Sequence, residues 1–262
     1  MKKLLLLGAL VTSSSVFATN NHSLQFNSDE CQVEFKNDVM ITPDHLQITT
    51  AQQSKWTIND SGDVLKDGQV ISLTSTQQDA MRDYADSLRV QLPKVANIAL
   101  EGVKIAGVAL NEVSNALELS SLDSIGTVLD ELHIEINETF YQDGAFVMGK
   151  QTFDQFGNNF DKQFEDRIES AVQGAMMESI GSILMAIGSE MTSSNGDMSS
   201  FEQRMKDMGQ AIEEKVELQA RAIESQADQL CDQFETIAQT EQQLRQNIPE
   251  FSGYALFNTQ LN

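Results

Sequence analysis

The sequence predicts an α+β protein, with a small N-terminal antiparallel β-sheet followed by a mainly α-helical bundle of long amphipathic helices. Residues 31–74 hold short alternating apolar and polar runs separated by turn-forming residues, a pattern typical of antiparallel strands. From Ser75 onward, apolar residues recur every three or four positions, which is the period of a helix. One cysteine lies in each part, at Cys31 and Cys231. A disulfide between them would hold the two parts against each other.

The strands predicted in the N-terminal part are bounded by turns. The segment "CQVEFKNDVMITPDHLQIT" holds two extended runs around the turn-forming pair Asn37-Asp38. "WTINDSGDVLKDGQVISLT" adds three short strands, and Asp67-Gly68 between the last two is a strong hairpin signal. Trp56 begins the first of the three and is interpreted as a packing residue rather than a platform for a ligand. A sheet of this size needs a packing partner to be stable.

Three helices are predicted over residues 75–92, 94–119 and 122–141. Ser75 is a candidate N-cap for the first of them, and Pro93 is expected to break or kink the chain after it. The run "AFVMG" that follows the third helix has a short β-like pattern ending at Gly149.

The most apolar stretch beyond the N-terminus is "AVQGAMMESIGSILMAIGSEM", residues 171–191. It continues the stripe of a phenylalanine-rich segment, so one long helix is predicted over residues 153–192. On a helical wheel the large apolar residues gather on one side. This side is a candidate client-binding or packing face, formed by Met176, Met177, Ile180, Ile183, Leu184, Ile187 and Met191.

Three glycines, Gly174, Gly181 and Gly188, recur at seven-residue intervals along one edge of this face. A row of small residues lets a neighbouring helix approach closely, so packing inside the protein is the preferred interpretation. The alternative is a methionine-rich surface that accepts apolar clients or lipids, because methionine adapts to irregular partners. A membrane-spanning helix is disfavoured, since Glu178 and Glu190 lie on the other side.

A turn is predicted over residues 193–197, followed by one helix over residues 199–246 in which apolar residues keep the helical period. A helix of about 45 residues would be about 65–70 Å long, which indicates a helical hairpin or coiled-coil arm. The predicted organisation is a signal peptide at 1–18, a flexible N-terminus at 19–30, the sheet region at 31–74, the helical bundle or hairpin at 75–248 and an irregular tail at 249–262.

The N-terminus has the pattern of a secretory signal peptide. Lys2 and Lys3 precede an apolar run over residues 4–11, and small residues lead to Ala18, after which we expect cleavage before Thr19. No other run reaches the roughly 18–20 uncharged residues that span a bilayer. The mature protein is therefore expected to be exported and soluble, with no transmembrane segment.

The chain is strongly acidic. Its net charge is −22, and removal of the signal peptide, which holds two lysines and no acidic residue, would change this to −24. Nucleic acids and anionic lipid surfaces are bound through clustered Lys and Arg, so neither is an expected partner. Other envelope proteins remain as possible partners, and the sequence indicates no particular oligomeric state.

The sequence contains no pattern typical of a catalytic or cofactor site. His133 follows Asp130 by three residues, which is half of a carboxylate-bridged metal site, but no second helical His completes it. Glu131, Glu135 and Glu138 share one helix face and are interpreted as solvated, because acid–base catalysis needs carboxyl groups with separated pKa values. No nucleophile motif or phosphate loop occurs. We expect no catalytic, cofactor-binding or metal-binding residue and no enzymatic activity.

Cys31 and Cys231 are the two cysteines of the chain. In an oxidising compartment such a pair most simply forms an intramolecular disulfide, and the alternatives are two free thiols or an intermolecular bond. The intramolecular bond would close a loop of about 200 residues, for which chain-entropy models give about 5 kcal/mol as an upper value. It would tie the N-terminal region to the C-terminal one.

Segments across the chain point to a family. The first cysteine opens the segment "CQVEFKNDVMITPDHLQI". It is followed by the segment "INDSGDVLKDGQVISLTSTQQDAMRDYADSLRVQLP", and the second cysteine lies in "QLCDQF". With these segments and the signal peptide, the chain resembles the YggN family, exported proteins of unknown function from Gram-negative bacteria. The match is most specific over residues 31–93 and weakens to a shared helical texture over 94–192. The resemblance implies a periplasmic location and a disulfide, and implies no activity.

The first function hypothesis is a non-enzymatic envelope protein that binds other proteins or apolar clients, as a holdase or an assembly factor does. The long amphipathic helices, the methionine-rich faces and the acidity motivate it. One alternative is a carrier for a lipid or other apolar ligand. Another is a cell-envelope hydrolase, which would need a cleft that gathers carboxyl groups with raised pKa values.

Overall fold

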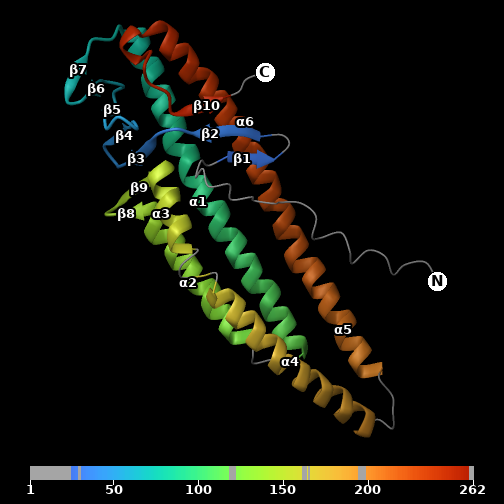
Figure 1. The fold of residues 1–262 in the computed structure, drawn as a ribbon. Coiled ribbons are helices and arrows are strands. Elements are labelled where there is room, and N and C mark those ends of the chain that lie inside the picture. The colour runs from blue at the N-terminus through green and yellow to red at the C-terminus, as the bar shows by residue number, and fades with distance from the viewer. Residues whose placement is uncertain are drawn as a thin grey trace.

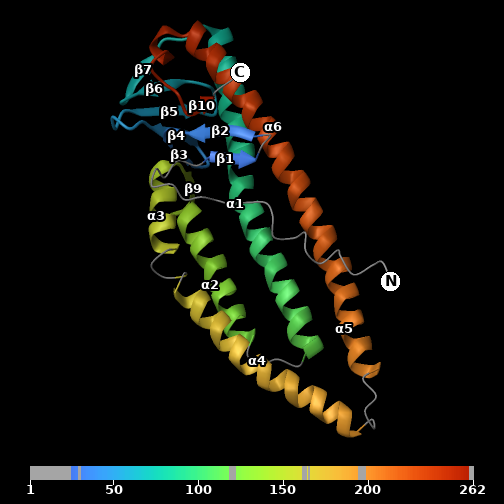
Figure 2. The same ribbon diagram turned by 45° about the vertical axis from the view of Figure 1, so that its right-hand side comes forward.

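In the computed structural model, two sheets lie at one end of an elongated molecule and long helices extend from them to the other end (Figures 1 and 2). The structure describes residues 25–28, 31–117, 122–160, 164, 166–193 and 199–259. The predicted signal peptide and its cleavage site at Ala18 and Thr19 lie outside these residues. No helix in the described ranges combines the length and the apolar character needed to cross a membrane. The predicted α+β class is confirmed.

The larger sheet is antiparallel, with the strand order β7-β6-β5-β4-β3-β9-β8. Its strands are β3 (Asp38–Ile41), β4 (His45–Thr49), β5 (Lys55–Asn59), β6 (Val64–Lys66), β7 (Gln69–Ile71), β8 (Tyr141–Gln142) and β9 (Ala145–Met148). The predicted Asp67-Gly68 hairpin is confirmed, because φ angles of 50° and 81° at these residues form the turn between β6 and β7. The β-like run before Gly149 is β9, which pairs with β3.

A smaller sheet joins the two ends of the described chain. It contains β1 (Gln25–Ser28), β2 (Cys31–Phe35) and β10 (Phe257–Thr259), in the order β1-β2-β10. The strand predicted to begin at Cys31 therefore belongs to this sheet and not to the larger one. The expectation of an irregular tail is wrong at residues 249–251, which form a 3-10 turn, η4 (Pro249–Phe251), and at residues 257–259, which form β10; residues 252–256 between them are turns and irregular backbone. The tail is ordered because it buries Ile248, Phe251, Tyr254, Leu256 and Phe257.

The helical part is built from six α-helices and one π-helical turn within the described ranges. They are α1 (Ser75–Leu117), α2 (Asp123–Phe140), α3 (Lys150–Phe160), α4 (Asp166–Ser193), α5 (Ser199–Ile212), η3 (Glu213–Glu217) and α6 (Leu218–Asn247). The helix predicted over 199–246 is confirmed as the uninterrupted run α5–η3–α6. The single helix predicted over 153–192 corresponds in the described ranges to two helices, α3 and α4. Both pack on α2, and α3 also contacts β3 and β9.

Helix α1 differs from its prediction at both Pro93 and its start. The predicted break at Pro93 is wrong, since α1 continues through it. Proline removes one helical hydrogen bond, but Leu92 and Ala96 beside it are buried, and packing of α1 against α6 keeps the helix continuous. The N-cap is Thr74 rather than Ser75. Its hydroxyl oxygen accepts from the Gln77 amide at 3.3 Å, while the Gln77 side-chain oxygen accepts from the Thr74 amide at 2.9 Å, which is a capping box.

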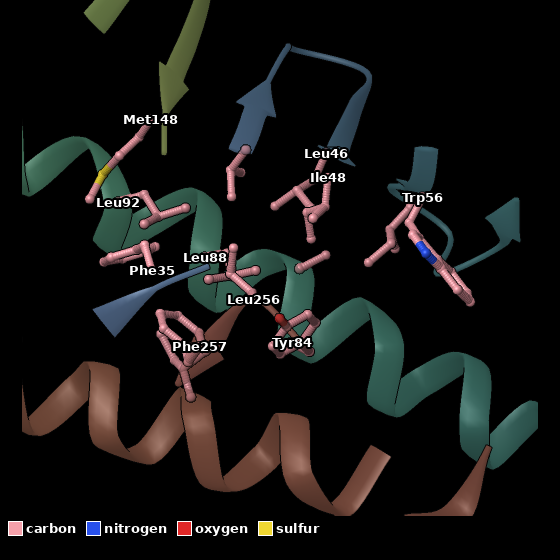
Figure 3. Close-up of a cluster of buried hydrophobic side chains, with 14 of the residues drawn as sticks. Phe35, Leu46, Ile48, Trp56, Tyr84, Leu88, Leu92, Met148, Leu256 and Phe257 are labelled. Atoms are coloured by element: carbon pink, nitrogen blue, oxygen red, sulfur yellow. The ribbon is translucent and has the colours of Figure 1, made fainter. Parts of the chain in front are cut away.

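The main core lies between the larger sheet, α1, α6 and the C-terminal tail (Figure 3). Leu46 and Ile48 extend from the sheet towards α1, and Leu256 and Phe257 of the tail lie between α1 and α6. Trp56 is a packing residue, as interpreted, because its ring lies 5.2 Å from that of Phe251 and is 2% exposed. The tail is thus a structural layer of the core.

Candidate functional site

The candidate face lies on α4, which runs along α2 and reaches the end of the molecule farthest from the sheets (Figures 1 and 2). Its first half is held in place. Arg167 forms an ion pair with Glu131 of α2, and Ala175 packs beside Leu122 in a small apolar cluster. Beyond Ala175 the helix leaves this support.

The large apolar side chains that follow are mainly exposed. Their exposed fractions are 63% for Met176, 79% for Met177, 61% for Ile180, 63% for Leu184 and 72% for Met185. We call these five residues the apolar α4 face. Four of them were predicted, and Met185 adds to the prediction. The other predicted members, Ile183, Ile187 and Met191, lie on α4, but their side chains are outside the described part of the structure.

The glycine row lies beside these residues, with open space where side chains would be. A methyl group added at Gly174, Gly181 or Gly188 would meet no described atom within 4 Å. The close approach of another helix, which was the preferred interpretation, is therefore not found in the described part of the chain. The physical reason is that α5, which follows α4, packs mainly along α1 and makes few contacts with α4. The described residues instead fit the alternative of an exposed apolar surface.

The two cysteines lie on elements that contact each other. Cys31 opens β2, Cys231 lies on α6, and β2 packs on α6. Cys231 is half-buried beside the main core, and the described residues contain no free cysteine. The contact between β2 and α6 therefore brings together the two elements that carry the cysteines.

The predicted acidic and histidine residues do not converge on one site. His133 and Asp130 lie on the wall of a groove between α1 and α2. Glu131 pairs with Arg167, and Glu135 accepts a hydrogen bond from Asn159 at 3.0 Å. Within the described ranges, no group of three or more His, Cys, Asp or Glu residues is placed to hold a metal ion.

The groove between α1 and α2 has a volume of about 580 Å³. Leu100, Val103 and Leu129 give it an apolar lining, and Lys104 lies on its wall with His133 and Asp130. Gly107 and Gly126 face the groove from opposite helices, so its width comes from missing side chains.

Sequence reasoning missed a buried carboxyl group on α6. Glu241 is 2% exposed, and burial raises its pKa to about 7, although hydrogen bonds from Tyr84 and from the Leu256 and Phe257 amides oppose the shift. The available signal was its position in the helical stripe. Glu241 falls three residues before Leu244, where an apolar residue would be expected.

Comparison with known proteins gives one family. Residues 31–257 match the family described as "Protein of unknown function (DUF2884)". Two relatives from Escherichia coli, strains K12 and O157:H7, are both called "Uncharacterized protein YggN". Each is 28% identical over 138 residues, which cover 53% of this chain and 54% of the relative. The match thus spans about half the length of these relatives, and no solved structure matches the chain.

The family match and the relatives agree with the resemblance seen in the strand and helix segments near the N-terminus. The matched residues include both sheets' central strands, the long helices, and most of the C-terminal tail. This chain is similar to the YggN proteins over about half of their length, and it belongs to the DUF2884 family of proteins of unknown function.

Proposed function

We propose that this chain is an exported, non-enzymatic protein that binds apolar segments of other cell-envelope proteins through the apolar α4 face. The observation that carries the proposal is the exposure of five large apolar side chains on one helix, each more than 60% exposed. Contiguous exposed apolar patches are uncommon on monomeric proteins and mark interaction sites. The periplasm is the compartment that the signal-peptide pattern and the family resemblance support.

The chemistry of this face suits partners of varied sequence. Met176, Met177 and Met185 supply flexible, polarisable side chains that adapt to irregular apolar surfaces. The neighbouring glycines carry no side chain that would hold a partner backbone away. A methionine-rich surface with space for a close backbone approach fits a binding protein of the chaperone or assembly-factor kind.

The charge of α4 favours a protein partner over a membrane surface. Binding of an amphipathic helix to anionic lipid depends on Lys and Arg along its polar side. The one basic residue of α4 is Arg167, which lies in the first turn and pairs with Glu131, whereas acidic residues lie within the exposed stretch at Glu178 and after it at Glu190. Binding of this helix to a bilayer would therefore be stabilised by little besides the apolar contacts.

The test replaces three residues of the face together: Met177→Gln, Ile180→Gln and Met185→Gln. We expect the purified mature wild-type protein to slow the aggregation of a urea-denatured outer-membrane protein after dilution, as measured by light scattering. The triple variant should lose most of this activity, because each substitution removes apolar area that a client would cover. Since the three side chains are exposed, the melting temperature should stay close to that of the wild type.

The matched control is Leu218→Gln with Val70→Gln, which removes side chains that are 69% and 73% exposed at other places. This variant should keep full activity. Photo-crosslinking from position 177 in cells should capture envelope proteins, and crosslinking from position 218 should not. Failure of the wild type to slow aggregation, or equal activity in the triple and control variants, would overturn the proposal. Binding of the wild type to anionic vesicles but not to the denatured protein would also overturn it.

A second candidate function is a carrier of a small apolar ligand, which the groove between α1 and α2 favours. Its volume of about 580 Å³ and apolar lining lie within the range of small-molecule sites. Native mass spectrometry of the purified protein tests this candidate. A co-purified lipid that is lost in Gly107→Leu, which fills the groove, would support it, and ligand-free wild-type protein would count against it.

The hydrolase alternative has less support from the geometry. It requires a cleft that gathers carboxyl groups with raised pKa values. Glu241, whose pKa is raised to about 7, is 2% exposed and lies among core residues, out of reach of a substrate. Asp38, whose pKa is also raised by burial, accepts a hydrogen bond from the Gln151 amide at the start of α3, where it acts as a helix cap.

We also propose that Cys31 and Cys231 form the intramolecular disulfide. Reduction should lower the free energy of unfolding by about 2–4 kcal/mol, because the bond restricts a long loop in the unfolded chain. Urea unfolding with and without dithiothreitol measures this difference. The intact mass under non-reducing conditions should be 2 Da below that of the reduced monomer, and a monomer with two free thiols would contradict the bond.

A further inference from the structure

The groove between α1 and α2 has a fixed register, because the two helices run in opposite directions and touch at both ends of it (Figure 2). Near the sheets, the hydroxyl of Tyr141, directly after α2, donates to Asn97 Oδ1 of α1 at 3.4 Å. Towards the other end of the molecule, a Cβ at Gly126 would lie 3.8 Å from Leu110 Cδ2. These two contacts show which residues of the two helices lie level with each other.

The charged residues of the groove gather in the half nearer the sheets. Glu101 and Lys104 of α1 line this half, and at this register His133 of α2 lies level with Lys104, with Asp130 about one turn further on. All four residues are exposed. In the described part of the chain the side chains of Lys104, Asp130 and His133 have no ion pair or hydrogen bond, and Glu101 accepts one hydrogen bond, from Gln226 at 3.4 Å. This half therefore has a solvent-facing rim that carries charges of both signs.

The floor of the groove and its other half are apolar. Val108, Leu110 and Leu129 line that half and are half-buried, and Leu110 also packs on the small apolar cluster at Leu122. The α1 residues that line the groove lie within 100–111, which span about 16 Å along a helix. A slot of this length, with a volume of about 580 Å³, suits one alkyl chain that lies along the two helices.

We propose that this groove binds a single-chain zwitterionic amphiphile, with the alkyl chain on the apolar floor and the head group at the charged rim. A phosphate of the head group would face Lys104 and His133, and an ammonium would face Asp130 and Glu101. The inference rests on the carrier function, the second of the two proposed functions, and names the chemical class of its ligand.

Charge complementarity selects this head group over a singly charged one. An anionic head would face Glu101 and Asp130 on a chain whose net charge is −22, so repulsion between like charges would oppose its binding. A cationic head would pair with these carboxylates but would lie beside Lys104. A head group with both charges can face the opposite sign at each place. The rim therefore fits a ligand that is neutral as a whole and charged at two points.

Isothermal titration calorimetry with three amphiphiles that share one dodecyl chain tests the head group. The probes are dodecylphosphocholine, dodecanoate and dodecyltrimethylammonium, each below its micelle-forming concentration. Because the chain is the same, a difference in Kd reports the head group alone. We expect the mature protein to bind dodecylphosphocholine about fivefold more tightly than either of the others, the size expected for exposed charge pairs. Gly107→Leu, which fills the slot, should bind none of the three.

Reversal of one charge should change the order of the three ligands. In Lys104→Glu, dodecylphosphocholine should bind about fivefold more weakly than in the wild type, and dodecyltrimethylammonium should become the tightest ligand, because three carboxylates would then surround the head group. The matched control is Lys94→Glu, which makes the same charge change at an exposed residue of α1 that does not line this groove. This variant should keep the wild-type order.

Equal Kd values for the three probes in the wild type would overturn the proposal without any variant, and so would an unchanged order in Lys104→Glu. Binding that survives in Gly107→Leu and is lost in the triple variant of the apolar α4 face would place the amphiphile on α4 and overturn the groove as its site. Absence of binding of all three probes would also overturn the proposal. Native mass spectrometry decides the carrier function itself, and light scattering decides client binding, so failure of either is distinguished from failure of the head-group selection.

Discussion

A chain that ends at Asn247 is expected not to fold. The missing segment carries five buried apolar residues, Ile248, Phe251, Tyr254, Leu256 and Phe257. Its loss would expose the apolar surfaces that they cover and leave β2 without its partner β10, and burial of one large apolar side chain alone contributes about 1.5–3 kcal/mol. The summed loss is as large as the whole free energy of unfolding of a typical domain, about 5–15 kcal/mol. Near-ultraviolet circular dichroism and gel filtration of the shortened protein measure the outcome.

A point variant gives the same test with less disruption. Phe251→Ala should lower the free energy of unfolding by about 3–5 kcal/mol, because Phe251 is 1% exposed and stacks on Tyr254 with ring centres 4.1 Å apart. The control is Leu218→Ala, a side chain that is 69% exposed, which should change stability by less than about 0.5 kcal/mol. A shortened chain with the native near-ultraviolet spectrum would contradict the structural role of the tail.

The second large effect is expected at Gly149, between β9 and α3. A Cβ at this position would lie 2.4 Å from Asp38 Cα and 2.8 Å from the Asn37 carbonyl oxygen, at a φ of +156°. Neither backbone atom can move without displacing β3, the strand beside β9 in the larger sheet. Gly149→Val should therefore lower the free energy of unfolding by about 4 kcal/mol, as backbone strain and overpacking add. Urea unfolding followed by tryptophan fluorescence measures the change.

Gly157 is the matched control on the neighbouring helix. It lies within α3, and a Cβ there would meet no described atom within 4 Å. Gly157→Ala should raise stability by up to about 1 kcal/mol, because alanine favours the helix. Equal effects of Gly149→Val and Gly157→Ala would show that the close contact with Asp38 does not decide the cost.

Patterns that repeat along the chain predicted the elements well. The Asp67-Gly68 hairpin and the helix over 199–246 each rest on local signals that the structure bears out. A matching signal, Asp143-Gly144, forms the equivalent turn between β8 and β9 and was overlooked because it follows a helix. The prediction at Pro93 failed because the sequence shows only the local cost of proline, which is a lost helical hydrogen bond. Packing of α1 against α6 offsets this cost.

The sequence predicted which residues form the candidate site, but it did not predict whether other elements cover them. Helical periodicity places Met176, Ile180 and Leu184 on one side of α4, but it does not say whether another element covers that side. Coverage depends on the path of α5 relative to α4, which is a long-range feature. The tail was missed for a related reason, because a short segment without a period reveals its burial only when the partner surface is known. Glu241 lies in the apolar stripe of α6, and its burial was missed although that position signalled it.

The pairing of the two chain ends sets the order in which the protein can fold. Asn37 donates its side-chain amide to the Ala255 carbonyl, 218 positions later, and β2 is completed only by β10. During synthesis the core therefore stays open until the last residues emerge, and contacts of such long separation form slowly. A growing chain that lacks residues 248–257 therefore lacks part of its core. Late closure would keep it suited to passage across a membrane as an unfolded chain, which is what an export signal would require of it.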